Sequence, residues 1–153
     1  MTQEIEVVQE AERLANKDEK SLELLLGMRQ KAIDKDPNLE NVVDFEPQYN
    51  GPTMGPLDDV VALGNKILRR WNKELNSLVC SQDSANKKDR DAILGALSLG
   101  ETAVIAAVAA ALFGLGVPAP IAAALAPLIV KRFIWPAKDE LCLAWSEAIK
   151  AEG

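Results

Sequence analysis

Histidine is absent from this chain of 153 residues, and aromatic residues make up only 5% of it. Without histidine, the protein has no serine–histidine or cysteine–histidine catalytic pair, no histidine metal ligand and no histidine pH sensor. Carboxylates, lysines and two cysteines remain as the groups that could carry chemistry. Apolar residues (48%) and charged residues (26%) occur in the proportions of a globular protein, so we expect a single helical domain over residues 1–153.

The two cysteines, Cys80 and Cys142, lie far apart in the sequence and belong to no CxxC pair. Zinc and iron–sulfur sites need clusters of cysteine or histidine, so the sequence predicts no metal and no cofactor. A chain of 16.6 kDa can fold without a staple, which favours two buried free thiols. Cys142 stands in the apolar run 141–144, which predicts an inert thiol, and a disulfide is the open alternative.

Positive charge is concentrated in one stretch of an otherwise acidic chain, whose net charge is −6. Four cations recur there at helical spacing and would form a basic stripe on one helix: Lys66, Arg69, Arg70 and Lys73. A nucleic-acid site normally combines a basic domain with several aromatic residues, whereas this stretch offers only Trp71. The pattern therefore argues against nucleic acid and favours a solvated face or a docking site for an acidic partner protein.

The N-terminal third is acidic and has the apolar spacing of helices over residues 5–15 and 22–33. The acidic side chains of the first stretch fall on the face opposite the apolar one: Glu4, Glu6, Glu10 and Glu12. Residues 1–33 thus form one long helix or a helical hairpin. The first residues lack the basic start and apolar run of a secretory signal, so the expected location is the cytoplasm, with peripheral or inducible membrane association as the alternative.

Residues 34–56 are expected to be a non-helical loop, because they contain four prolines and two glycines. Apolar residues within the loop should tether it to the body of the protein. Loops held in this way often carry binding residues, which makes Phe45 and Tyr49 candidates for contact with a partner.

Residues 57–153 are predicted to form the helical core. The clearest helical pattern covers residues 57–80, where Gly64 indicates either a close helix crossing or simple tolerance of glycine. Ser98 and Glu101 have the spacing of a capping box, which places a helix start near residue 99, and another is expected near 87. No segment alternates with the period of a strand. The predicted fold class is all-α, a compact bundle of about five to seven helices around an alanine-rich apolar hairpin at residues 103–130.

The hairpin is the unusual feature of the sequence. Residues 103–130 contain no charged or hydrogen-bonding side chain, and eleven of these 28 residues are alanine. Gly114, Gly116, Pro118 and Pro120 divide the run into two arms, each too short to span a bilayer. In a soluble bundle such arms lie at the centre, surrounded by amphipathic helices.

The alternative is that residues 103–135 leave the bundle and enter a membrane. Basic and aromatic residues follow the apolar run, as they do at membrane interfaces. The candidate membrane contacts are Phe113, Lys131, Arg132, Phe133 and Trp135. Cations and a proline also end ordinary core helices, so both interpretations stay open.

Carboxylates offer the remaining route to catalysis. The pairs Asp58–Asp59 and Asp139–Glu140 stand where helices are expected to begin, a position that acidic residues favour because of the helix dipole. No acid, base and nucleophile converge in the sequence, and no phosphate-binding glycine loop is present. The leading hypothesis is therefore a non-enzymatic protein–protein interaction or adaptor domain. The alternatives are a membrane-active effector and a carboxylate-based enzyme.

Overall fold

The computed structural model describes residues 2–81 and 84–152, and within these ranges all regular elements are helical. The α-helices are α1 (Thr2–Leu14), α2 (Glu19–Lys35), α3 (Gly51–Met54), α4 (Leu57–Cys80), α5 (Lys87–Ala96), α6 (Glu101–Gly114), α7 (Ala119–Ile129) and α8 (Leu141–Ala151). Shorter helical turns are η1 (Pro37–Asn41), η2 (Ser84–Asn86), η3 (Val130–Ile134) and η4 (Lys138–Glu140). The predicted all-α bundle is confirmed.

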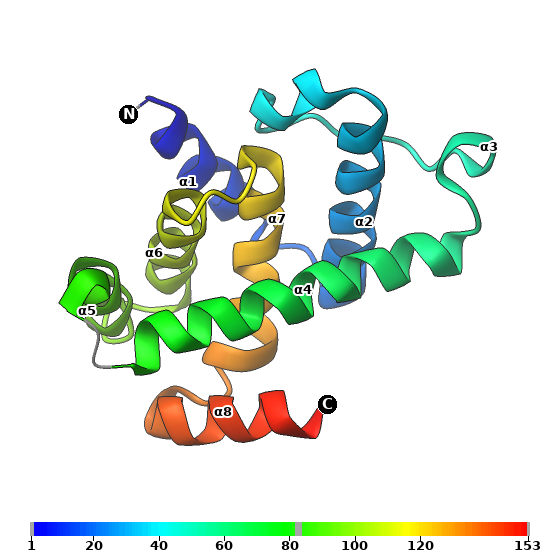
Figure 1. Cartoon of the computed structure of the whole chain (residues 1–153). Helices are drawn as coiled ribbons and strands as arrows, with labels where there is room; N and C mark the ends of the chain where they lie inside the picture. Colours follow the sequence, from blue (N-terminus) through cyan, green and yellow to red (C-terminus); the bar gives the residue numbers. More distant parts are fainter. Residues whose placement is uncertain (1, 82–83, 153) are drawn as a thin grey trace.

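Helix α7 is the centre of the bundle, and all of its residues are buried. Figure 1 shows α1 and α6 on one side of it and α2 on the other, while the long helix α4 crosses the group. An apolar helix without a polar face must be covered on every side, and the amphipathic helices provide that cover. The expected apolar hairpin is present, because α6 leads through residues 115–118 into α7, which packs back against it.

The turn of the hairpin depends on glycine and proline. Gly116 has a φ of 98°, in the left-handed region that favours glycine, and Pro118 caps the start of α7. Pro127 lies inside α7, where proline removes a backbone hydrogen bond. The chain then continues into η3, a π-helical turn closed by the amide of Trp135, which donates to the carbonyl of Val130 over 2.8 Å.

Helices α2 and α4 cross in direct backbone contact. A β-carbon at Gly27 would overlap the carbonyl of Val60, and a β-carbon at Gly64 would overlap the carbonyl of Glu23. Each helix therefore has a glycine where the backbone of the other passes. Of the two interpretations of Gly64, the structure supports the close helix crossing.

The two cysteines form a disulfide, so the prediction of free thiols is wrong. Cys80 ends α4 and Cys142 is the second residue of α8, with their Cα atoms 5.6 Å apart. Cys142 is also exposed rather than buried, because it faces away from the core at the start of α8. Its apolar neighbours in the sequence suggested burial, but Leu143 points to solvent as well, with 60% of its surface exposed.

Several predicted boundaries need correction. The 34–56 segment contains the turn η1 and the single-turn helix α3, and α2 extends to Lys35. The predicted capping box of Ser98 and Glu101 does not form. Gly100 occupies the N-cap position of α6, and the hydroxyl of Ser98 donates to the carbonyl of Gly95 instead. Residues 1–33 form two helices, α1 and α2, and Asp18 caps α2 by accepting from the amide of Ser21 over 2.7 Å.

Candidate functional site

A groove of about 710 Å³ lies between α4, the end of α2 and the turn of the hairpin. One wall is a row of apolar side chains on successive turns of α4: Leu63, Ile67 and Trp71. The facing wall consists of Leu115, Gly116, Pro118 and Ile121. Gln30 and Asp34 of α2 complete the lining. The lining is therefore mixed, with apolar surface on α4 and the hairpin turn and polar groups beside it, and a concave site of this kind can bind a ligand through both.

Lys66 and Arg70 form the basic part of this lining. They lie four residues apart, so they project from the same face of α4 beside the apolar row. Neither forms an ion pair with any residue in the described ranges. The guanidinium of Arg70 lies 4.7 Å from the ring centroid of Trp71, which holds the charge next to the apolar wall.

The structure divides the basic stripe between two places. Arg69 and Lys73, also four residues apart, line a small depression of about 40 Å³ between α4 and α8. Asn72 of α4 and Ile149 and Glu152 at the end of the chain complete this second lining. Two of the four predicted cations therefore belong to the large groove, and two lie beside α8.

Phe45 and Tyr49 lie outside the groove lining. The hydroxyl of Tyr49 donates to the carbonyl of Gly55 over 2.6 Å, which closes the loop on itself. Phe45 is half-buried, and the guanidinium of Arg29 lies 5.8 Å from its ring centroid. The tethering of the loop by side chains is confirmed, since Val43 and Met54 are buried.

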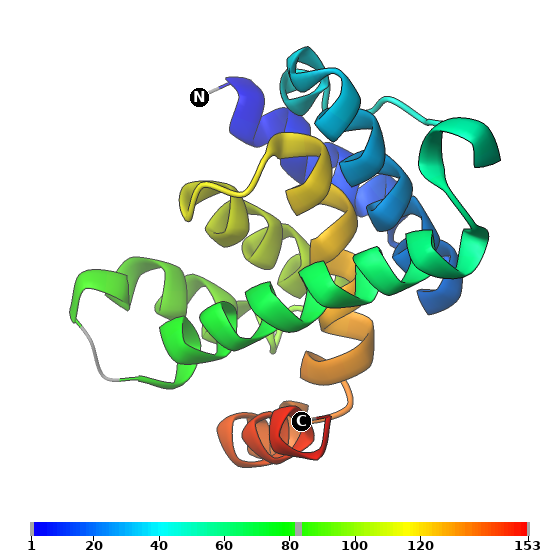
Figure 2. The same ribbon diagram turned by 45° about the vertical axis from the view of Figure 1, so that its right-hand side comes forward.

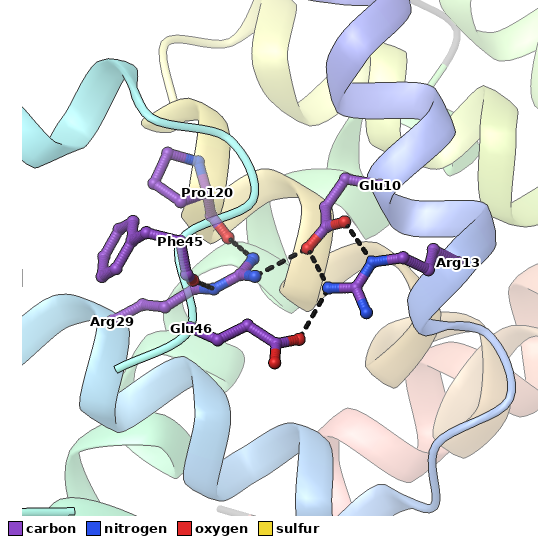
Figure 3. A network of polar contacts seen from close by, with 6 residues as sticks. All are labelled: Glu10, Arg13, Arg29, Phe45, Glu46 and Pro120. Atoms are coloured by element: carbon purple, nitrogen blue, oxygen red, sulfur yellow. Dashed lines mark hydrogen bonds and ion pairs between the residues drawn. The ribbon is translucent and has the colours of Figure 1, made fainter. Parts of the chain in front are cut away.

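A buried ionic network was missed by the sequence analysis. Arg29 has no exposed surface, and it donates to the carbonyls of Phe45 and Pro120 and to the carboxylate of Glu10 (Figure 3). Arg13 binds Glu10 through two nitrogens and reaches Glu46 over 2.8 Å. The network connects α1, α2, the loop and the start of α7, so its role is to stabilise the packing of these segments.

The placement of Glu10 on the solvent face is therefore wrong, because only 5% of its surface is exposed. The sequence does indicate that Arg29, which pairs with Glu10, is buried. Arg29 continues the apolar stripe of Leu25, Leu26 and Ile33 at helical spacing, and a charge in such a position needs a buried partner.

The network predicts a pH dependence of stability. Burial alone raises the pKa of the Glu10 carboxyl, but hydrogen bonds from Arg13 and Arg29 outweigh it and lower that pKa below the usual 4.5. A lowered folded-state pKa stabilises the protein above the unfolded pKa, and this stabilisation is lost as the pH falls through the folded value. Glu10→Gln should therefore reduce the free energy of unfolding more at pH 7 than at pH 3.5, measured by urea unfolding. The control is Glu12→Gln at an exposed position of α1, and a loss for Glu10→Gln that is equal at both pH values would contradict the assignment.

The candidate membrane contacts pack against the bundle and are buried to different degrees. Arg132 pairs with Glu19 and Glu23 of α2 at 2.7 and 2.6 Å, and Lys131 lies 3.6 Å from Glu101. Phe133 is buried, whereas Phe113 and Trp135 are half-buried. Within the described ranges no single helix has the length and apolarity to cross a membrane. Two consecutive helical segments, Ala119–Ile134 and Lys138–Ala151, together have the length and hydropathy of a membrane span, and they are bent by 75° relative to each other.

The two carboxylate pairs are far from each other. Asp58 and Asp59 lie in the first turn of α4, and Asp139 and Glu140 lie just before α8, which is joined to the opposite end of α4. A helix of 24 residues is about 36 Å long, so the pairs do not share a site. No group of three potential metal ligands occurs among the residues that the structure describes. Comparisons of the chain with family models, with curated proteins and with solved structures find no match.

Proposed function

We propose that this protein is a protein-interaction module that docks an acidic, amphipathic helix of a partner protein in the groove beside α4. The observation that carries the proposal is the pairing of Lys66 and Arg70, which lack ion pairs within the described structure, with the apolar row of Leu63, Ile67 and Trp71. Apolar contact supplies affinity for such a partner, and complementary charge supplies orientation and rate of association.

The dimensions of the groove support this choice of partner. The row from Leu63 to Trp71 covers eight helical steps, about 12 Å along the axis of α4. A partner helix of two to three turns would fill that length, with apolar residues at i, i+3, i+4 and i+7 against the row. Acidic residues on one flank of that helix would meet Lys66 and Arg70.

The expected result is selective binding of an acidic amphipathic peptide. The probe is a labelled 14-residue helical peptide with leucine on one face and glutamate on one flank, and its binding is followed by fluorescence anisotropy at physiological ionic strength. Lys66→Glu combined with Arg70→Glu should weaken its binding about tenfold or more, because attraction becomes repulsion at the edge of an apolar contact. Of the three tryptophans only Trp71 lines the groove, so a change in tryptophan emission when the peptide is added provides a second signal.

The chain offers a matched control. Arg69→Glu combined with Lys73→Glu makes the same charge change on the same helix, outside the groove. This control variant should bind the acidic peptide within a factor of about two to three of the unmodified protein, because charges on the other flank of α4 are not in contact with the peptide and are largely screened at this ionic strength. A peptide that binds both double variants equally, or that binds none of the proteins, would overturn the proposal. A peptide with lysine in place of glutamate should bind more weakly than the acidic one.

A further inference from the structure

Helix α8 is a peripheral element joined to the bundle at few points. In both Figure 1 and Figure 2 it lies apart from α1, α2, α6 and α7, below α4 and η3. It packs mainly against those two elements and against η4, which precedes it. Its outer face is open to solvent and includes Leu143, Glu147 and Lys150.

Besides the apolar packing of Leu141, Trp145 and Ile149 in the core, three side-chain contacts link α8 to α4. Trp145 is fully buried, and its indole nitrogen donates to the side-chain oxygen of Asn72 over 2.8 Å. The side-chain amide of Asn76 donates to the hydroxyl of Ser146 over 3.4 Å. The third contact is the disulfide between Cys80 and Cys142. An isolated helix of 11 residues is marginal in water, so these contacts decide whether α8 stays in place.

We propose that the disulfide is a redox-controlled latch that fixes α8 on α4. The chain already joins the start of α8 to η3 through residues 135–140. That connection links the start of α8 to η3 but not to α4, whereas the disulfide is a covalent point in the first turn of α8 that ties the helix directly to the end of α4. Cys142 lies on the exposed side of this bond and is accessible to an attacking thiolate.

The reductant is a dithiol, small or protein-borne. Its thiolate attacks the Sγ of Cys142, the bond between the two cysteine sulfurs breaks, and the Sγ of Cys80 leaves as a thiolate that takes a proton from water. The second thiol of the reductant then attacks the mixed disulfide, releases Cys142 as a thiol and closes the disulfide of the oxidised reductant. Two electrons pass from the dithiol to the cysteine pair.

Opening the latch exposes surface that the oxidised protein hides. The indole of Trp145 and the face of α4 around Asn72 become accessible when α8 swings away. Disulfides persist in oxidising compartments and are reduced in the cytosol, so the state of α8 reports the compartment that holds the protein. The latch lies outside the groove lining, and its failure would leave the proposed docking function intact.

Hydrogen exchange of the intact protein tests the latch. Amides of α8 (Leu141–Ala151) should exchange about tenfold or more faster after reduction by dithiothreitol, while those of α1, α6 and α7 keep their protection. The tryptophan emission, to which Trp145 contributes beside Trp71 and Trp135, should shift to the red at the same time. If the exchange of α8 stayed unchanged, Trp145 and Asn72 would hold the helix without the disulfide. If all helices lost protection equally, the disulfide would stabilise the whole fold rather than α8. Either result overturns the latch.

Variants provide a second route to the reduced state. Cys142→Ser should reproduce the fast exchange of α8 without reductant, and adding dithiothreitol to it should change nothing further. Leu143→Ser, at the exposed position after Cys142, leaves the disulfide intact, is the matched control and should keep the slow exchange of the oxidised protein. If Cys142→Ser exchanged as slowly as the oxidised protein, the latch would be refuted.

Discussion

Replacing Arg29 by methionine is expected to lower the free energy of unfolding by about 3 kcal/mol, because the buried Glu10 carboxylate loses one of its two arginine partners and keeps only the partly exposed Arg13. The carbonyls of Phe45 and Pro120 lose a donor as well. Methionine replaces the apolar part of the arginine side chain but not the guanidinium, so the loss reports mainly the charge and its hydrogen bonds. Urea unfolding at pH 7, followed by circular dichroism, measures the difference.

A double-mutant cycle separates the ion pair from other effects. Glu10→Gln combined with Arg29→Met should be less destabilised than the sum of the two single changes, because each single change leaves the other charge buried. Arg69→Met is the matched control, since Arg69 is exposed and forms no ion pair in the described structure. Its effect should stay within about 0.5 kcal/mol. Losses that simply add in the cycle would show that Glu10 and Arg29 are not coupled.

Replacing Gly64 by alanine is expected to destabilise the protein by about 1–3 kcal/mol or more, because the new methyl group would overlap the carbonyl of Glu23. The overlap is with backbone, which has no rotamer to change, so α2 and α4 must separate. Gly27→Ala should have a similar effect through the carbonyl of Val60. Thermal unfolding followed by circular dichroism measures both.

Gly95 provides the control for the effect of alanine on a helix. It lies in α5, and a β-carbon there would meet no atom within 4 Å. Gly95→Ala should therefore stabilise the protein by up to about 1 kcal/mol through the lower entropy of the unfolded chain. A stabilising effect of Gly64→Ala comparable to that of Gly95→Ala would contradict the backbone contact between α2 and α4.

The apolar pattern of the sequence was sufficient to predict the architecture. The run at 103–130 lacks any polar side chain, and burial on all sides follows directly from that composition. The periodicity of residues 57–80 likewise predicted α4 to within its observed bounds. Both features depend on the hydrophobic effect, which is non-directional and can be read from composition and spacing.

The ionic network and the disulfide could not be predicted in the same way. Pairing of Glu10 with Arg29 depends on how α1 and α2 approach α7, which no local pattern contains. The bond between Cys80 and Cys142 requires the end of α4 to meet the start of α8, and two distant cysteines do not indicate their distance in space. Such directional contacts follow from the fold and were accessible only once it was known.

The basic residues of α4 show the same difference between what spacing predicts and what depends on the fold. Spacing alone put Lys66, Arg69, Arg70 and Lys73 on one stripe, because residues three and four apart share a helix face. The structure separates them, since α8 packs beside Arg69 and Lys73 while the turn of the hairpin lies opposite Lys66 and Arg70. The position of neighbouring elements, rather than the helix itself, decided which cations belong to the groove.

The glycine contact between α2 and α4 has a mechanical consequence for the groove. Where two helices touch through backbone atoms, no side chain between them can change rotamer to absorb a displacement, so the pair is stiff. Gln30 and Asp34 on α2 and Lys66 and Arg70 on α4 are therefore held at a constant separation. The opposite wall includes the short turn around Gly116, so a partner that needs a wider opening is expected to displace that turn rather than α2 or α4.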